Sequence, residues 1–438
     1  MTTAAAAHED AALVRDSAVH RRVYTDPEVF AREQERIFRR VWLYVAHESE
    51  VPRPGDFVVT RLGPDEVVLV RQPDASLALL HNRCAHRGAR VVGEASGCAR
   101  RFHCPYHSWT YRLDGTLLGV PLPAGYGEGF VEGAGGMARV PRVASYRGFV
   151  FASHAGQGEE LPQFLGGLAS ALDNMVDRSP SGALTRAGGR LRMEYRGNWK
   201  LFMENATDLV HPGFVHESSV AAARESSRPG GGGGATGQTL DMLLSNGLAV
   251  PQWDDVPLHA FPNGHVYMGG FYRRGIIAPQ REDAVYARYR AALAARHGEA
   301  RTTEILGVDR FNNLIWPGLS VNSRFAVLRQ VTPLDVDRSV ITSTCFRFDG
   351  APDEMFDLTL QFLNTASSPA SMVASDDLEV FERCQRGLSD RSVEWIDMSR
   401  GMGRDRHAPR GVVEAPGTSE VAVRNQMAAW QRWMGAGP

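Results

Sequence analysis

The stretch from Asn82 to Trp109, NRCAHRGARVVGEASGCARRFHCPYHSW, places a histidine close behind a cysteine twice. Cys84 and His86 form a C-x-H pair, and Cys104 and His107 form a C-x2-H pair. Thiolate sulfur and imidazole nitrogen are ligands of transition metals. Because the whole chain holds only five cysteines, this clustering predicts a metal site between the two pairs.

Two metal groups suit these four donors. Two thiolates and two imidazoles can hold one tetrahedral zinc ion, or a [2Fe-2S] cluster with the cysteines on one iron and the histidines on the other. Ligand type alone leaves both open. The residues next to the two pairs favour the cluster. Gly88 and Pro105 place the pairs in turns, and Trp109 and Tyr106 could shield the edge of a cluster from water. Cys98 has no histidine at a matching distance, so we expect it to be no ligand.

Length and charge limit the class of protein. At 438 residues the chain is long enough for two domains. Its 48 basic and 50 acidic residues give a net charge of -2, which predicts no broad basic surface for nucleic acid or anionic lipid. The N-terminal MTTAAAAHED is charged where an export signal would be apolar, and no apolar run is long enough for a membrane span. We therefore expect a cytoplasmic protein, and an odd cysteine count there argues against disulfides.

The first part of the chain has mainly strand signals. A helix is expected over residues 27–46, with Asp26 as its N-cap. Short strands rich in aliphatic residues are then expected at 56–62, 66–71 and 77–81, a hairpin at 111–120 around Asp114-Gly115, and a further strand at 146–153. Residues 40–153 are therefore predicted to form an all-β domain.

The remainder mixes helix and strand signals. Helices are expected at 161–177, 282–298, 369–386 and 418–433, a strand running into a helix at 190–202, and a strand pair at 324–333 and 339–348. This pattern predicts an α+β domain with an antiparallel sheet, built from residues 1–39 and 154–438. The run PGGGGGATG at 229–237 is expected to be either a lid or a solvent loop. No glycine motif for a nicotinamide-binding domain is present.

A second group of candidate ligands lies in NWKLFMENATDLVHPGFVHES, residues 198–218. Asp208 and His211 would share one face of a helix. Pro212 should end or bend that helix, and the bend could return His216 to the same side. Two imidazoles there suit a divalent transition metal. The alternative is two unrelated histidines, one capping a helix and one in solvent.

A carboxylate from another helix could complete this site. Asp377 falls inside the apolar stripe of the helix expected to start at Pro369. That stripe comprises Met372, Val373, Val380, Phe381 and Cys384. A buried carboxylate is costly without a cationic partner, and two histidines with one carboxylate form the facial triad of non-haem Fe(II) oxygenases. Asp376 is expected to be a solvated or hydrogen-bonded neighbour.

Together these stretches resemble the catalytic α subunit of Rieske non-haem iron ring-hydroxylating oxygenases, from about Pro27 onward. The likeness rests on NRCAHRG and CPYHSW, on the run NWK-x3-EN-x2-D-x2-H-x4-H, and on the D-x4-E-x2-Q pattern at Asp377, Glu382 and Gln385. It implies an all-β Rieske domain inserted before a helix-grip catalytic domain. The cofactors implied are a [2Fe-2S] cluster held by Cys84, His86, Cys104 and His107, and a mononuclear Fe(II) held by His211, His216 and Asp377.

The resemblance also implies partners. In the family the chains form a ring, here a homotrimer or an α3β3 assembly with a β subunit. Electrons come from NADH through a separate reductase, with or without a ferredoxin. Asp208 would bridge His107 of one chain and His211 of its neighbour. The substrates would be O2 and an aromatic compound, most commonly cis-dihydroxylated, with monohydroxylation or O-demethylation as alternatives.

Two features bear on the substrate. The short spacing from Asn205 to Asp208 is more similar to members that act on aromatic carboxylates. In the expected strand NSRFAVLRQV, Arg324 and Arg329 would face opposite sides, so one could point inward and bind a carboxylate through two parallel hydrogen bonds. In some aryl-carboxylate members the arginine before Gln-x-x-Pro, here Arg329, has this role. A surface salt bridge is the alternative.

Two other classes of protein were weighed. A Rieske electron-transfer protein without oxygenase activity would need only the first domain. A lipid-binding or regulatory protein that reuses the larger fold would have lost the second group of ligands. The presence of Asp208, His211, His216 and Asp377 argues against both.

Overall fold

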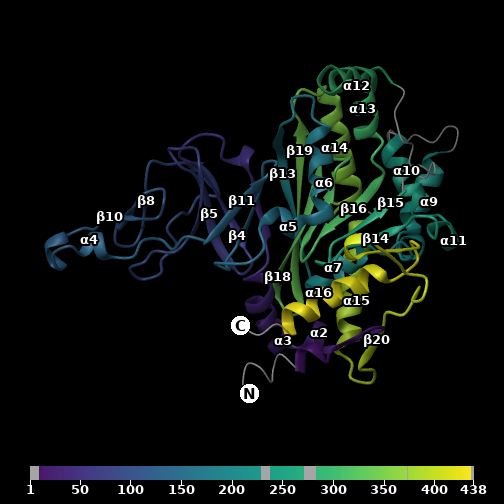
Figure 1. The fold of residues 1–438 in the computed structure, drawn as a ribbon, viewed down its shortest axis with the longest axis horizontal. Helices are drawn as coiled ribbons and strands as arrows, with labels where there is room; N and C mark the ends of the chain where they lie inside the picture. Colours follow the sequence, from purple (N-terminus) through teal and green to yellow (C-terminus); the bar gives the residue numbers. More distant parts are fainter. Residues whose placement is uncertain (1–8, 228–236, 271–282, 372, 436–438) are drawn as a thin grey trace. The chain divides into compact units, whose positions relative to one another are not determined.

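The computed structural model describes residues 9–227, 237–270, 283–371 and 373–435 (Figure 1). The chain divides into two compact units, one formed by Phe38–Phe164 and the other by Met1–Ile37 with Leu165–Pro438. Most of the glycine-rich run at 229–237 lies outside the described residues, and so does Met372. Among the described helices, none is long and apolar enough to cross a membrane.

The smaller unit is built from short antiparallel strands. Their bounds are β3 Leu43–His47, β4 Asp56–Leu62, β5 Asp65–Arg71, β6 Leu77–His81, β7 Ser96–Cys98, β8 Phe102–His103, β9 Thr110–Tyr111, β10 Leu117–Gly119, β11 Arg142–Tyr146 and β12 Phe149–Ser153, with the short helices α4 Phe130–Gly133 and, at the end of the unit, α5 Leu161–Leu165. They pair in the orders β6-β5-β4-β7, β10-β9-β8 and β11-β12-β3. The prediction of an all-β architecture for this part of the chain is confirmed.

The predicted turn at Asp114-Gly115 has a clear steric basis. Gly115 has a φ of +91°, and a Cβ there would lie 2.6 Å from the carbonyl oxygen of Met137. Only glycine tolerates both conditions at low cost. The hairpin of β9 and β10 therefore forms where the sequence predicts it.

The helix expected over residues 27–46 is only half right. α3 covers Pro27–Glu33, a π-helical turn follows over Gln34–Phe38, and the chain then enters β3. Every residue of β3 is buried, so its apolar residues show no alternation. A fully buried strand cannot be distinguished from a buried helix by periodicity alone.

The larger unit contains an antiparallel sheet in the order β13-β19-β18-β17-β16-β15-β14-β22-β21. Its strands are β13 Leu184–Tyr195, β14 Leu258–Ala260, β15 Val266–Gly269, β16 Arg310–Ile315, β17 Leu319–Asn322, β18 Val327–Asp335, β19 Arg338–Phe348, β21 Arg406–Ala408 and β22 Val412–Ala415. A small separate sheet has the order β1-β2-β20, formed by Val14–Arg15, Ala18–His20 and Trp395–Asp397. The predicted antiparallel sheet is confirmed.

Helices flank this sheet (Figure 1). They are α2 Arg22–Thr25, α3, α6 Ala169–Asp177, α7 Trp199–Asn205, α8 Pro212–Val215, α9 Glu217–Ser226, α10 Gly237–Ser245, α11 Val250–Trp253, α12 Ala284–His297, α13 Glu299–Leu306, α14 Asp353–Ala366, α15 Ala374–Ser389 and α16 Val421–Gly435. α7 packs on β18, α14 on β19 and α16 on β14. This α+β arrangement agrees with the predicted fold class.

Two predicted elements need correction. α15 begins at Ala374 rather than Pro369, and the Ser371 hydroxyl, which precedes the helix, accepts a hydrogen bond from the Ala374 N–H at 3.0 Å. The strand expected across 322–331 is interrupted by a turn at 323–326, where Ala326 has a φ of +51°. Arg324 lies in this turn and Arg329 in β18, so the expectation that both lie in one continuous strand is wrong.

Candidate active site and metal centres

Two loops of the smaller unit carry the cysteine–histidine pairs. In the first loop the Cys84 N–H donates to the Ala89 carbonyl, and Gly88, with a φ of +75°, closes the turn. In the second, the Ser108 N–H donates to the Cys104 carbonyl at 3.0 Å. Backbone hydrogen bonds thus shape both loops independently of any bound group.

The loops bring all four predicted cluster ligands together. Cys84 and Cys104 are both buried, and the Cys104 side chain is among the groups that lower the pKa of the Cys84 thiol. The His86 and His107 ring centroids lie 4.8 Å apart. The Nδ1 atom of each ring is buried and has no hydrogen-bond partner among the described residues. A buried imidazole nitrogen without a partner is costly, so both rings fit a metal at Nδ1.

Neighbouring side chains support a thiolate at Cys84. Burial alone would raise the pKa of the Cys84 thiol, but the Tyr111 hydroxyl, 3.0 Å from its sulfur, and nearby backbone N–H groups lower it. The thiolate is the form that binds metal. Trp109 is buried and stacks on the His86 ring at 4.7 Å, whereas Tyr106 is 61% exposed. Of the two aromatic residues expected to shield the edge, only Trp109 is buried.

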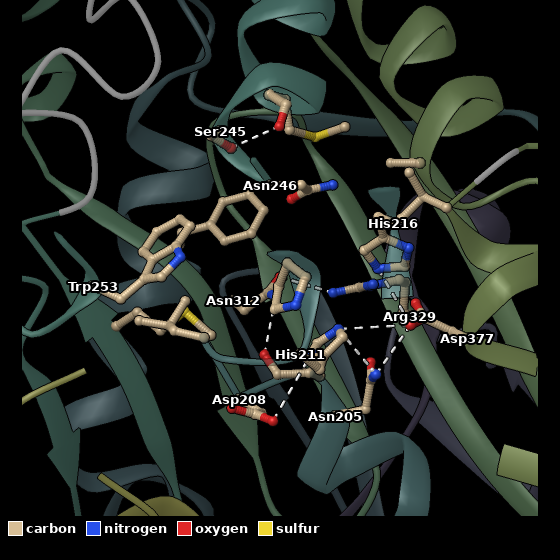
Figure 2. A pocket seen from close by; sticks show the side chains of 18 of the residues that line it. Asn205, Asp208, His211, His216, Ser245, Asn246, Trp253, Asn312, Arg329 and Asp377 are labelled. Carbon is tan, nitrogen blue, oxygen red and sulfur yellow. Dashed lines mark hydrogen bonds and ion pairs between the residues drawn. The ribbon is translucent and has the colours of Figure 1, made fainter. Parts of the chain in front are cut away.

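The larger unit brings His211, His216 and Asp377 together (Figure 2). The Asp377 Oδ1 atom lies 3.6 Å from His211 Nε2 and 3.4 Å from His216 Nε2. Ligand atoms held by one tetrahedral or octahedral ion at about 2.1 Å are separated by roughly 3.0–3.5 Å. The three side chains therefore fit a single metal ion, which would leave further coordination positions open.

The path of the backbone between these residues differs from the prediction. α7 ends at Asn205, so Asp208 and His211 lie in the segment between α7 and α8, not on one helix. Pro212 begins α8 instead of ending a helix, because proline is favoured at the first helical position, where no N–H is needed. The single turn of α8 then places His216 next to His211, with ring centroids 5.5 Å apart.

Asp377 sits in the first turn of α15, which packs against α7 and α8. Gln385 fixes this packing: its side-chain oxygen accepts from the Asn198 N–H at 2.9 Å, and its amide donates to the Tyr24 carbonyl at 3.0 Å. Asn198 is the N-cap of α7. The glutamine of the D-x4-E-x2-Q pattern thus joins α15, which carries Asp377, to the N-terminus of α7.

Asp208 lies beside His211, with Oδ2 3.7 Å from Nδ1. Its other oxygen accepts from the Val210 N–H at 2.8 Å and lies 3.4 Å from the Arg400 guanidinium. Burial would raise the pKa of Asp208, but His211, Val210 and Arg400 outweigh it and lower the pKa. Asp208 is therefore a carboxylate next to the histidine, as a bridging role requires.

A cavity of about 90 Å3 lies next to the three candidate ligands. Its apolar lining includes Leu209, Met242, Trp253, Met268, Phe311 and Phe362. Arg329 and Asn312 provide polar groups, and the guanidinium donates to the Asn312 side-chain oxygen at 2.7 Å (Figure 2). Arg324 does not line this cavity. Of the two arginines, the structure places only Arg329 near the candidate metal ligands.

Three side chains of this site were missed or underrated from the sequence. Asn205 donates to Asp377 Oδ1 at 3.0 Å and lies 3.1 Å from His211 Nε2. Asn312 donates to the Ala206 carbonyl at 3.0 Å, which orients it toward Arg329. Asp376 lies 3.4 Å from His216 Nδ1, in the hydrogen-bonded position expected for it. The position of Asn205 within the EN-x2-D run was the only signal for it, and Asn312 had none.

Comparison with known proteins identifies the family. A model of the Rieske [2Fe-2S] domain matches residues 41–146, and a model of the ring hydroxylating alpha subunit (catalytic domain) matches residues 183–436. The chain belongs to the ring-hydroxylating oxygenase α subunits. It is thus an oxidoreductase of the Rieske type, which carries a [2Fe-2S] cluster and a mononuclear iron.

Similar members of this family are named for aromatic compounds. The chain is 31% identical to the anthranilate 1,2-dioxygenase large subunit of Acinetobacter baylyi, over 94% of this chain and 88% of that protein. It is 32% identical to the 2-halobenzoate 1,2-dioxygenase large subunit of Burkholderia cepacia, over 87% and 79%. The structure of a naphthalene 1,2-dioxygenase mutant bound to phenanthrene matches with a TM-score of 0.82 and 26% identity, over 97% and 94%.

Proposed function

We propose that this α subunit is the terminal oxygenase of an enzyme that cis-dihydroxylates a single-ring aromatic carboxylate, using O2 and electrons from NADH. The observation that carries the proposal is the Arg329 guanidinium, which faces the cavity beside the candidate iron ligands. Within the described residues no carboxylate lies within 4.0 Å of it. A part-buried cation without an anion in such a cavity is suited to an anionic substrate.

The electrostatics of Arg329 support an anionic ligand. Burial lowers the pKa of the guanidinium, and Asp377 opposes this effect only from a distance. A substrate carboxylate could accept two parallel hydrogen bonds from it. The ring attached to that carboxylate would then lie among the apolar residues of the cavity, next to the iron.

The small volume of the cavity counts against a fused-ring substrate. An engineered cavity of about 150 Å3 holds a single benzene ring, and the present cavity is about 90 Å3, so even one ring would require the lining side chains to move outward. Both similar large subunits reported above are named for aryl carboxylates. These observations favour a benzoate-like substrate over a fused-ring hydrocarbon.

In this proposal His211, His216 and Asp377 hold the mononuclear iron, while Cys84, His86, Cys104 and His107 hold the cluster. When bound, the cluster would supply electrons and the iron would supply the chemistry that activates O2 beside the substrate. Asn205 donates to Asp377 and fixes the orientation of the carboxylate ligand. Trp253 and Phe362 exclude water from the reacting ring.

Electron supply depends on other proteins and on assembly. A separate NADH-dependent reductase, with or without a ferredoxin, would reduce the cluster. The chains would assemble as a homotrimer or an α3β3 complex, in which Asp208 links His107 of one chain to His211 of the next. The part-buried, ionised state of Asp208 and its distance to His211 support this role.

The proposal is tested by oxygen uptake with a reconstituted reductase across aromatic acids and neutral arenes, with products identified. Benzoate-like acids should be oxidised to cis-diols, and neutral arenes should be poor substrates. In Arg329→Gln, kcat/KM for benzoate should fall roughly 10- to 100-fold, because charge-assisted hydrogen bonds contribute roughly 1.5–3 kcal/mol.

Arg324→Gln is the matched control, because it removes a guanidinium outside the cavity and should leave kcat/KM unchanged. Equal use of benzoate by the Arg329→Gln protein and the unaltered protein would refute the substrate assignment. Monohydroxylated or demethylated products would instead support a Rieske monooxygenase or O-demethylase.

A further inference from the structure

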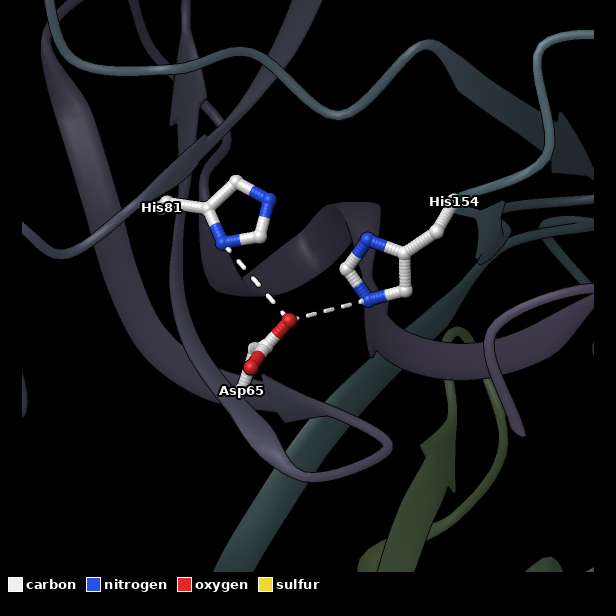
Figure 3. A group of neighbouring side chains, drawn as sticks. All are labelled: Asp65, His81 and His154. Atoms are coloured by element: carbon white, nitrogen blue, oxygen red, sulfur yellow. Dashed lines mark ion pairs between the residues drawn. The ribbon is translucent and has the colours of Figure 1, made fainter. Parts of the chain in front are cut away.

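A second group with two histidines and one aspartate lies within the smaller unit (Figure 3). Asp65 begins β5, His81 ends β6 and His154 directly follows β12. One ligand atom from each side chain lies within 4.8 Å of the other two. None of these residues belongs to the cluster loops or to the candidate iron site.

The geometry of this group matches that of the candidate iron ligands. Asp65 Oδ2 lies 3.4 Å from His154 Nε2 and 3.8 Å from His81 Nδ1. The corresponding separations around Asp377 Oδ1 are 3.4 and 3.6 Å. Ligand atoms in a tetrahedral zinc site with bonds of about 2.0–2.2 Å are roughly 3.3–3.6 Å apart. An ion could therefore bind here with small side-chain movements.

The histidines are in the form that binds metal. Burial lowers the pKa of both His81 and His154, and the nearby Asp65 only partly opposes this effect. Both rings are therefore neutral near pH 7, with a nitrogen lone pair available. His154 is 9% exposed, whereas Asp65 and His81 are each 25% exposed, which leaves a route for an ion and a water ligand.

Two existing contacts would compete with a metal. The Arg39 guanidinium lies 3.2 Å from Asp65 Oδ2 and also lies 3.4 Å from Oδ1. The Leu62 carbonyl lies 3.3 Å from His154 Nε2. Metal binding would require Arg39 to give up its contact with Asp65 Oδ2 and keep only the contact with Oδ1. It would also require the His154 ring to give up its contact with the Leu62 carbonyl. Arg39 thus neutralises Asp65 when no ion is bound and sets the affinity of the site.

We propose that Asp65, His81 and His154 bind a divalent transition-metal ion of the zinc type, separate from both iron centres. Asp65 and His81 belong to the sheet β6-β5-β4-β7, and His154 continues from the sheet β11-β12-β3. A bound ion would join these two sheets of the smaller unit. Because the ion would bind the folded unit, it would raise the free energy of unfolding by RT ln(1 + c/Kd), where c is the concentration of the free ion.

The test is zinc binding by the complete protein with its cluster and mononuclear iron in place. The protein is dialysed against micromolar zinc chloride and then against metal-free buffer, and zinc and iron per chain are measured by mass spectrometry. The unaltered protein should retain one zinc per chain. His154→Gln and Asp65→Asn should retain none, and Arg39→Gln should bind zinc more tightly than the unaltered protein.

Two controls separate this site from others. His407→Gln removes an exposed histidine of β21 and should bind zinc like the unaltered protein. His216→Ala impairs the candidate iron site and should still retain one zinc. The visible absorption of the cluster shows whether each variant has folded. Absence of zinc in the unaltered protein, equal zinc in His154→Gln, or loss of zinc in His216→Ala would overturn the proposal.

Discussion

Tyr111 belongs to neither cysteine–histidine pair, but its side chain directly contacts the candidate cluster ligand Cys84. Its hydroxyl is 3.0 Å from the Cys84 sulfur and accepts a hydrogen bond from the Ala85 N–H at 3.2 Å. The phenol can therefore direct its proton only toward the sulfur. A hydrogen bond to a cluster-bound thiolate stabilises the reduced, more negative state.

Tyr111→Phe should therefore lower the reduction potential of the cluster by tens of millivolts while the cluster remains bound. Protein-film voltammetry or a redox titration followed by visible absorption measures this change. Tyr106→Phe is the matched control, since this exposed phenol makes no hydrogen bond to a cysteine sulfur among the described residues. An unchanged potential in Tyr111→Phe would show that the hydroxyl does not tune the cluster.

The residues predicted from the sequence were those with a distinctive spacing and chemistry. Cysteine–histidine pairs and a histidine pair next to proline are rare patterns, so the candidate ligands could be named. Asn205 and Asn312 act through side-chain amide hydrogen bonds to residues brought together by the fold, which leave no pattern in a single sequence. Asn312 also has a φ of +43° within β16, a backbone conformation that only the folded sheet reveals.

At the scale of helices, Glu33 joins three elements around the site. Its carboxylate accepts from Lys200 Nζ at 2.6 Å, from the Trp199 indole at 2.9 Å and from the Trp430 indole at 2.6 Å. Lys200 and Trp199 begin α7, and Trp430 lies in α16. Burial lowers the pKa of Lys200, and Glu33 opposes this effect by stabilising the charged ammonium. Loss of the Glu33 carboxylate would leave this buried ammonium without its counter-ion.

Glu33→Ala should consequently lower the free energy of unfolding by about 3–5 kcal/mol, the usual cost of breaking a buried ion pair. Urea denaturation followed by tryptophan fluorescence provides the measurement. Glu28→Ala changes an exposed carboxylate on the same helix and should alter stability by less than about 0.5 kcal/mol. Similar losses in both variants would contradict a special role for Glu33.

Elements bounded by strong turn signals were predicted well, and those without such signals were not. β4 and β6 have the predicted bounds, because glycine, proline and aspartate turns flank them. The region around Pro212 was misassigned because proline can either end a helix or begin one, and the sequence alone does not choose between these. Only the packing of α8 against α15 decides it.

For the molecule as an assembly, Asp208 is the residue on which the proposed electron path depends. Asp208→Asn should leave both metals bound, because the aspartate is not among the candidate ligands, but should abolish turnover. Metal analysis and oxygen uptake with benzoate test this together. Glu420→Gln is the control, since Glu420 also lies beside Arg400, at 3.5 Å, and should support turnover. Normal turnover in Asp208→Asn would remove Asp208 from the electron path.

The two-unit architecture was predictable from the change in residue pattern along the chain, from short strands to mixed helices and strands. The sequence did not predict that α7, α15 and β18 meet around one cavity, because these elements are far apart in the sequence. Gln385, Asn312 and Arg329 acquire their roles only through that meeting. The choice of substrate therefore depends on tertiary contacts that no local pattern reveals.

The proposed activity is tested most directly by a single-turnover reaction under isotopically labelled oxygen gas. The protein, reduced beforehand at both metal centres, is mixed with benzoate and labelled O2, and the product is analysed by mass spectrometry. We predict a cis-diol in which both hydroxyl oxygens carry the label. A product with one labelled oxygen, or no labelled product from the fully reduced protein, would contradict the assignment of aryl-carboxylate dihydroxylation.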